Sequence, residues 1–250
     1  NIQIIVIGDS IGAEEAASSI TAEYYQNVKC TQEGTPLIND LFKIAKEKAK
    51  YDILVYVNAD IILPLNLLEI IKSLKKIPTT FLAVGSRWDL DVTEEINFNQ
   101  SISSSSFWEY ANKTAIQHMD AGIDYFIFKK TLFNKIPPLA IGRLGWDNWL
   151  LWKARRMRVP LINLTEVLFV VHQNHNYNYK IFKDKDELKQ TQDAQSNKLL
   201  INDRKLTLRD TNWLYVNKEI VPNRSSKFRR RNLIALQKIY PEFSLLIKIY

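Results

Sequence analysis

Two short runs of apolar, β-branched residues, each ended by a turn that carries a carboxylate, constrain the fold of this chain most. Residues 2–7 read Ile-Gln-Ile-Ile-Val-Ile and end at Gly8-Asp9. Asp52 to Val57 is similar and ends at Asn58-Ala59-Asp60. Runs of this length and composition, bounded by turn residues, predict buried strands. Each run therefore predicts a strand that carries an acidic side chain to the edge of a sheet.

Segments with helical spacing separate the predicted strands. Pro36 opens one of them, with Leu37 and Leu41 on one face, and Glu14 to Tyr25 also fits a helix. The other predicted elements are helices over 67–74 and 147–158 and strands over 81–84, 125–128 and 167–171. This alternation predicts an α/β fold with a mostly parallel sheet and helices on both faces. Ligands of such sheets bind at the carboxyl ends of the strands. We therefore expect Asp9, Asp60 and the stretch 87–89, which all follow predicted strands, on one rim.

The later part of the chain is more polar. Ser101 to Ser106 is a low-complexity stretch that predicts a surface loop. After about Tyr179 the chain is rich in Lys and Asn, with an apolar end at 245–250. We therefore predict a main domain over residues 1–179 and a C-terminal appendage over 180–250.

Composition restricts the class of protein. The 250 residues are 46% hydrophobic and 24% charged, which suits a globular domain with a buried core. No apolar run approaches the ~18 residues that span a bilayer, and no signal-peptide pattern opens the chain. Cys30 is the only cysteine, which excludes an intrachain disulfide and a thiolate metal site. A cytoplasmic location fits this cysteine content.

The formal net charge is +7, and part of the excess lies near the C-terminus. The cluster comprises Arg224, Lys227, Arg229, Arg230 and Arg231. It fits a solvated basic face, an anionic ligand or peripheral contact with an anionic membrane. Nucleic acid is the least favoured partner, because no recognisable binding motif surrounds the cluster.

Three local patterns suggest chemistry. Asp60 follows a buried strand and can offer oxygen to a hard divalent ion, although it could equally cap the helix that follows. Asp147 lies between Trp146 and Trp149 at a predicted helix start, which suits a base beside sugar-stacking rings, or else an N-cap beside core tryptophans. His172 directly follows a predicted strand and can serve as a metal ligand, or can be a satisfied surface histidine.

Six blocks in order carry a resemblance to a known family. They are Gly34-Thr35-Pro36-Leu37, Tyr56 to Ile62, Gly85 to Asp91, Gly122 to Phe126, Gly145 to Trp149 and His172 to His175. Together, from Ile2 to about Tyr179, they resemble the GT-A class of glycosyltransferases, which use nucleotide-diphospho-sugars. The resemblance implies a Rossmann-like GT-A domain, a divalent metal (Mn²⁺ or Mg²⁺), a nucleotide-sugar donor and a carbohydrate or glycoconjugate acceptor.

The resemblance also implies roles for single residues. Asp60 matches the metal-binding end of the family's Asp-x-Asp motif, and His172 matches the histidine that closes the metal site. Asp147 matches the catalytic base of inverting enzymes. Donor contacts are implied for Asp9, Thr35, Asn58, Asp60 and Arg87. Acceptor contacts are implied for Asp89, Asp124, Trp146 and Trp149.

Two departures and one rival class stand beside the resemblance. Asn58 replaces the first Asp of the motif, and the strand and helix with which the family usually begins are missing before Ile2. Both departures favour the alternative of a catalytically inactive GT-A domain that binds sugars or a partner. Gly8-Asp9-Ser10 after a strand is also found in SGNH esterases. Those enzymes need an Asp three residues before a His, which this chain lacks.

Overall fold

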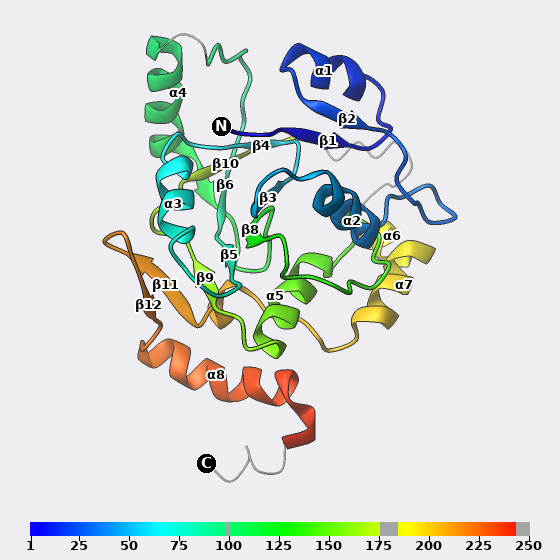
Figure 1. Cartoon of the computed structure of the whole chain (residues 1–250), viewed down its shortest axis with the longest axis vertical. Helices are drawn as coiled ribbons and strands as arrows, with labels where there is room; N and C mark the ends of the chain where they lie inside the picture. Colours follow the sequence, from blue (N-terminus) through cyan, green and yellow to red (C-terminus); the bar gives the residue numbers. More distant parts are fainter. Residues whose placement is uncertain (99–100, 176–184, 244–250) are drawn as a thin grey trace.

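The computed structural model describes residues 1–98, 101–175 and 185–243 as an α/β fold around a six-stranded sheet (Figure 1). Its strand order is β12-β11-β9-β5-β8-β3. The strands are β3 (Ile53–Val57), β5 (Leu82–Val84), β8 (Tyr125–Lys129), β9 (Leu161–Asn163), β11 (Trp213–Val216) and β12 (Glu219–Pro222). The strands predicted at 52–57, 81–84 and 125–128 are thus confirmed.

The prediction of a mostly parallel sheet was wrong, because this sheet is mixed. β9 runs parallel to β5 and to β11, whereas β8 is antiparallel to both of its neighbours, and β12 is antiparallel to β11. The chain leaves β5 through a second sheet and a helix and re-enters as β8 at the same end of the central sheet, where Val84 pairs with Phe126. The order of helices and strands along a sequence does not say in which direction a later strand runs. Parallel pairing is expected where a direct crossover joins two consecutive strands, and β5 and β8 are not joined in that way.

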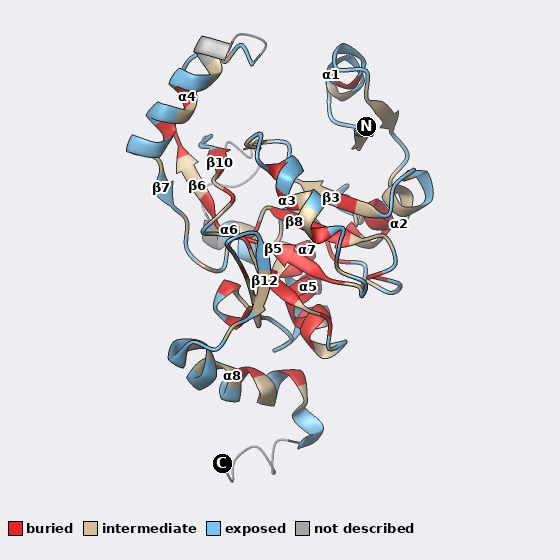
Figure 2. Ribbon diagram, turned by 60° about the vertical axis from the view of Figure 1, so that its left-hand side comes forward, coloured by how far each residue is buried: buried red, intermediate tan, exposed pale blue. Residues whose placement is uncertain are grey.

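Helices cover both faces of the sheet, as predicted. β8 shows the alternation of a strand between two cores: Phe126 and Phe128 pack in one cluster, and Tyr125 and Ile127 pack in the other. β5 and β8 are buried along almost all of their length, and Figure 2 shows buried ribbon in this part of the sheet. The first cluster contains residues of α2 (Ile38–Lys48), α5 (Trp146–Arg156) and α8 (Ser226–Ile239), and the second contains residues of α3 (Leu67–Leu74).

A four-stranded sheet continues from the carboxyl ends of β3 and β5. Its order is β4-β10-β6-β7, and β4 and β6 directly follow β3 and β5 along the chain. The strands are β4 (Ile61–Ile62), β6 (Arg87–Leu90), β7 (Ile116–Gln117) and β10 (Val170–Gln173). His172 therefore lies within β10, and not after a strand ending at Val171 as predicted.

Helix α4 (Ser101–Thr114) packs against this sheet, so the predicted loop at Ser101–Ser106 was wrong. Phe107 and Ala111 are buried against Leu90 and Val171. These two apolar residues of α4 are four positions apart, and both follow the serine run. Tertiary packing therefore overrides the weak helix propensity of the serine run.

The N-terminal strands form a separate small sheet. β1 (Ile5–Ile7) pairs in parallel with β2 (Glu23–Tyr25), and no other strand of the described residues pairs with either. The helix predicted over Glu14 to Tyr25 is only partly correct: α1 (Ala13–Ser19) ends early and β2 takes the second half. Thr21 adopts a left-handed φ of 56°, which breaks the helix before the two tyrosines of the strand.

The C-terminal region contributes two strands, β11 and β12, to the central sheet. β11 pairs in parallel with β9, and Arg155 of α5 donates to the backbone carbonyl of Asp210. A strand neighbour depends on long-range pairing, which the polar composition of this region does not reveal. The other elements are α6 (Lys185–Gln190), α7 (Gln192–Ile201), η1 (Leu208–Asp210) and η2 (Pro241–Phe243). The boundary at 179/180 and the apolar end at 245–250 lie outside the described residues.

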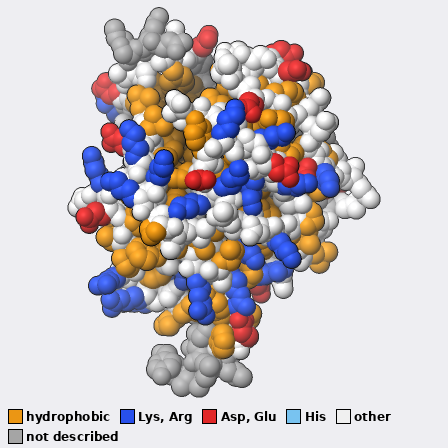
Figure 3. All heavy atoms as spheres, in the orientation of Figure 1, with side chains coloured by type: hydrophobic (Ala, Val, Ile, Leu, Met, Phe, Trp, Pro, Cys, Tyr) orange, Lys and Arg blue, Asp and Glu red, His pale blue; other side chains and the backbone are white. Residues whose placement is uncertain are grey.

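The basic cluster falls on and just before α8. Lys227, Arg229 and Arg230 are exposed, whereas Arg231 forms an ion pair with the buried Asp210. On the face drawn in Figure 3, Lys and Arg side chains are spread widely and not confined to α8. Within the described part of the chain, no helix has the length and apolar character needed to cross a membrane.

Candidate metal and ligand site

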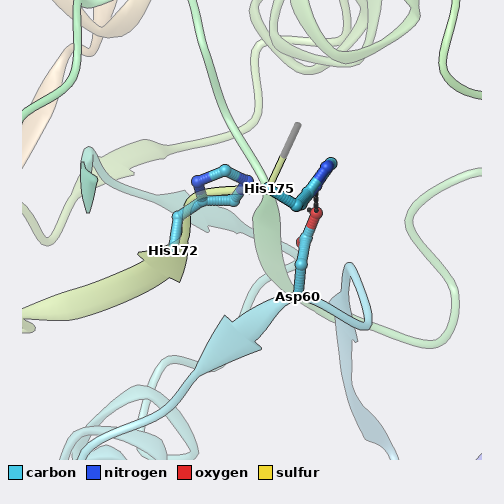
Figure 4. A group of neighbouring side chains, drawn as sticks. All are labelled: Asp60, His172 and His175. Atoms are coloured by element: carbon cyan, nitrogen blue, oxygen red, sulfur yellow. Dashed lines mark hydrogen bonds and ion pairs between the residues drawn. The ribbon is translucent and has the colours of Figure 1, made fainter. Parts of the chain in front are cut away.

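Asp60, His172 and His175 converge on one point at the junction of the two sheets (Figure 4). Nε2 of His172 lies 3.3 Å and Nε2 of His175 lies 3.1 Å from the same carboxylate oxygen, Oδ2 of Asp60. One ligand atom from each residue lies within 4.8 Å of the others. This is a possible metal-binding group of one carboxylate and two imidazoles.

Strand pairing explains why these residues meet. Asp60 lies between β3 and β4, and β4 is antiparallel to β10 with Ile61 opposite His172. The backbone N–H of Gln173 donates to the carbonyl of Asp60 at 3.0 Å and continues this pairing. The carboxylate and the imidazole therefore lie on neighbouring strands. The sequence predicts His172 as a ligand but not His175; the signal for His175 is its place at the end of the block His172 to His175.

The polar environment of Asp60 fits a cation ligand. Burial alone would raise the pKa of Asp60, but His172 and His175 outweigh it and hold that pKa below its usual value. Oδ1 of Asp60 is buried and has no hydrogen-bond partner. Since buried polar atoms are normally paired, this oxygen is a natural ligand for an ion. The interpretation of Asp60 as an N-cap fails, because Asn66 occupies the N-cap of α3.

A second polar group adjoins the first. Asp124 accepts hydrogen bonds from Arg87 Nη1 at 2.6 Å and from Asn58 Nδ2 at 2.7 Å. The Tyr56 hydroxyl donates to Asn58 Oδ1 at 2.9 Å. These contacts tie together the turn after β3 and the start of β6. They also explain the asparagine at position 58, because its amide donates to a carboxylate that a second Asp would repel.

Tyr56 lies near three carboxylates. Burial raises the pKa of its hydroxyl far above the usual range, and the negative charges of Asp124, Asp60 and Asp147 add to this effect. Asp147, which is distant in sequence, therefore acts on the same tyrosine as Asp60, a member of the possible metal-binding group.

Asp147 lies in the first turn of α5, whose N-cap is Gly145 with φ 93°. The N-cap interpretation of Asp147 is therefore excluded. The pKa of Asp147 is raised to about 7: burial is the main cause and the charge of Asp124 adds to it, against opposing backbone hydrogen bonds. Desolvation thus outweighs the helix dipole at this position. A carboxylate with this pKa suits proton transfer near neutral pH.

The two tryptophans are mainly core residues. Trp146 is 6% exposed and packs edge-on against Tyr56 with ring centroids 5.5 Å apart. Trp149 is 3% exposed and packs against Trp152. Trp146 borders the cavity described next, whereas Trp149 does not. The structure therefore leaves little ring surface of either for stacking on a sugar.

A cavity of about 2860 Å³ joins the candidate residues. Several predicted site residues line it: Thr35, Asn58, Asp60, Arg87, Asp124, Trp146, Asp147 and His172. Its wall also includes Arg143, which sequence reasoning missed and which donates to Thr35 Oγ1 at 3.2 Å. Asp9 is exposed after β1 and does not line the cavity. Asp89 does not line the cavity either. The apolar faces of β1 and β3 line another part of the cavity, so its volume exceeds the 300–1,000 Å³ of typical ligand sites.

The contact between Asn58 and Asp124 makes a prediction about stability. Asn58→Asp should destabilise the protein by about 1–3 kcal/mol at neutral pH, because two carboxylates would replace a hydrogen bond of 2.7 Å. The loss should shrink at acidic pH, where the pair can hold a proton. Urea unfolding at pH 7 and pH 5 measures both effects. Asn112→Asp, at an exposed asparagine on α4, is the control, and equal stability of both variants at pH 7 would contradict the prediction.

Comparisons of this chain with known proteins found no matching family model, no matching curated protein and no matching solved structure.

Proposed function

We propose that this chain is a metal-dependent glycosyltransferase domain of the GT-A type, which moves a sugar from a nucleotide-diphosphate donor to an acceptor hydroxyl. The observation that carries the proposal is that a metal-type group and a carboxylate with a pKa of about 7 line the same cavity. A transferase of this kind needs both a cation at the leaving diphosphate and a base at the acceptor.

Asp60, His172 and His175 would hold the divalent ion. Two imidazoles and one carboxylate favour a transition ion such as Mn²⁺ over Mg²⁺, whose preferred ligands are all oxygens. When bound, such an ion stabilises the negative charge that develops on a leaving diphosphate. Arg143 adds a guanidinium to the cavity wall beside Thr35, where it can meet a phosphate.

Asp147 would take the proton of the acceptor hydroxyl. Its pKa of about 7 leaves a substantial ionised fraction at neutral pH and makes it a stronger base than an exposed carboxylate. Attack by the activated hydroxyl on the face opposite the diphosphate would invert the anomeric centre in a single displacement. Asp124 is paired with Arg87 and Asn58, so we assign it to organising the site and not to proton transfer.

The alternative is an inactive domain that binds a nucleotide-sugar or a partner. The asparagine at position 58 favours it, but the internal pairing of Asn58 gives that residue a structural reason that does not depend on inactivity. Metal-dependent hydrolysis of the donor distinguishes the two, because only the enzyme turns over.

Thermal unfolding with a panel of nucleotide-diphospho-sugars, with and without Mn²⁺, tests the proposal. A donor present at 100 times its Kd stabilises the folded state by about 2.7 kcal/mol. For a chain of this size that raises Tm by about 5–10 °C. The expected result is a shift that one class of donor produces and that requires Mn²⁺. If Mn²⁺ alone shifts Tm and no donor adds to it, the site binds metal but the transferase proposal fails.

A further inference from the structure

Each strand of the four-stranded sheet has a carboxylate or an imidazole within it or directly beside it. Asp60 directly precedes β4, His172 lies in β10, Asp89 lies in β6 and His118 directly follows β7. The strand order β4-β10-β6-β7 therefore sets these residues in one row. Asp89 is directly opposite His172 in the parallel pairing of β6 and β10, so both side chains point to the same face of the sheet.

Carboxylates and imidazoles alternate along this row. Nε2 of His172 is 3.3 Å from Asp60, and Nδ1 of the same ring is 3.2 Å from Asp89 Oδ1. The other oxygen of Asp89, Oδ2, is 2.5 Å from Nδ1 of His118. The His172 ring thus has Asp60 at one nitrogen and Asp89 at the other.

Asp89 has no free oxygen for a sugar. Oδ1 accepts from Arg87 Nε at 2.9 Å, in addition to its contact with His172, and Oδ2 faces His118. Its side chain is 24% exposed, and it lies outside the cavity wall. These contacts argue against the acceptor role that we expected for Asp89 from the sequence.

His172 requires an orienting group. Its side chain is 3% exposed, and Nδ1 is buried without a well-aligned hydrogen bond. Asp89 Oδ1 at 3.2 Å is within reach of this nitrogen after a small turn of the ring. An imidazole whose Nδ1–H is held by a carboxylate keeps the Nε2 lone pair for a metal, and such orienting partners typically change metal affinity 10- to 100-fold.

His118 fits closely into the same row. A Cβ at position 122 would lie 2.4 Å from Cδ2 and 2.7 Å from Nε2 of His118, so Gly122 leaves the space for this ring. The backbone N–H of His118 also donates to the carbonyl of Arg87 at 2.9 Å. The His118 ring therefore has room beside Asp89, and its backbone is tied to β6.

We propose that Asp89 is the positioning residue of the metal site: held by Arg87 and His118, it keeps His172 as the Nδ1–H tautomer with Nε2 directed at the ion. This inference deepens the proposed function and rests on it for the identity of the ligand. Asp89 touches neither the metal nor the sugar.

Two measurements test the proposal. The first is the tautomer of His172 in the metal-free wild-type protein, read from ¹⁵N-edited NMR of the histidine rings. We expect Nδ1–H in the wild type and a change in Asp89→Asn. The second is Mn²⁺ affinity by calorimetry, which should fall about 10- to 100-fold in Asp89→Asn. The control is Asp91→Asn, which removes the same charge two residues away at an exposed carboxylate that accepts from Asn174.

The outcomes are separable from those of the proposed function. An Nε2–H tautomer in the wild type overturns the proposal without any variant, and so does Mn²⁺ affinity in Asp89→Asn within twofold of wild type. An equal loss in Asp91→Asn shows a general charge effect and also overturns it. If the wild type binds Mn²⁺ but no nucleotide-sugar, only the transferase function fails. If it binds no divalent ion, the metal assignment and this proposal fail together, whatever the tautomer.

Discussion

Asp147→Asn should lower turnover by about 100-fold or more while leaving donor affinity nearly unchanged. The amide keeps the shape of the side chain but cannot accept the acceptor's proton, and general bases contribute about 10²–10⁴-fold to a rate. Because the base acts only in the transition state, its loss should appear in kcat and not in donor Kd. Initial rates with a saturating donor, beside Mn²⁺-dependent donor binding, measure the two quantities.

The pH dependence provides a second test of Asp147. With a pKa of about 7, the ionised fraction and therefore kcat should rise about tenfold per pH unit below 7 and level off above it. Near-normal turnover by Asp147→Asn, or a product that keeps the donor's anomeric configuration, would exclude this residue as an inverting base. A matched control is Asp120→Asn, at a carboxylate that pairs with Arg209 and lies outside the cavity wall.

Asp147→Asn should lower turnover but raise the stability of the folded protein at alkaline pH. Burial raises the pKa of Asp147 in the folded state above that in the unfolded chain, so the folded protein binds the proton more tightly. This contribution to stability is present at pH values below the unfolded pKa of about 4 and is lost as pH rises through about 7. Asp147→Asn should therefore be more stable than wild type at pH 8, with the difference fading toward pH 4.

Asp60→Ala should abolish Mn²⁺ binding at the site. Oδ2 of Asp60 is the atom to which both His172 and His175 are directed, and its loss removes the anionic ligand. Calorimetry with Mn²⁺, and thermal unfolding with donor and Mn²⁺, should both lose their metal-dependent signal. The fold should survive, because Oδ1 has no partner and the side chain contributes no core packing.

Single-histidine variants extend this test. His172→Ala and His175→Ala should each weaken Mn²⁺ affinity, and the loss should be larger for His172, whose ring is buried and oriented, than for His175, whose side chain is 42% exposed. Asp52→Ala, at an exposed carboxylate before β3, is the control for charge. Unchanged Mn²⁺ affinity in Asp60→Ala would show that any bound ion lies elsewhere.

Local patterns in the sequence were sufficient to predict the helices and strands whose apolar residues recur with a clear period. The helix at 67–74 has the predicted bounds, and the strand ending at Val57 delivers Asp60 to the sheet edge as expected. These elements are specified by apolar side chains within a few residues of one another, so propensity and pattern are enough. Ser101–Ser106 shows the limit, since its helix depends on Phe107 and Ala111 packing against another sheet.

The sequence by itself determined that a carboxylate follows β3, that Asp147 opens a helix among tryptophans and that His172 belongs to a strand region. Only the tertiary structure decided that β8 runs antiparallel, that His175 joins Asp60, and that Asp89 faces His172 and His118 instead of the cavity. It also decided the direction of the Asp147 pKa shift. The physical reason is the same in each case: strand direction, cross-strand register and desolvation depend on residues far apart in the chain, and no local pattern encodes them.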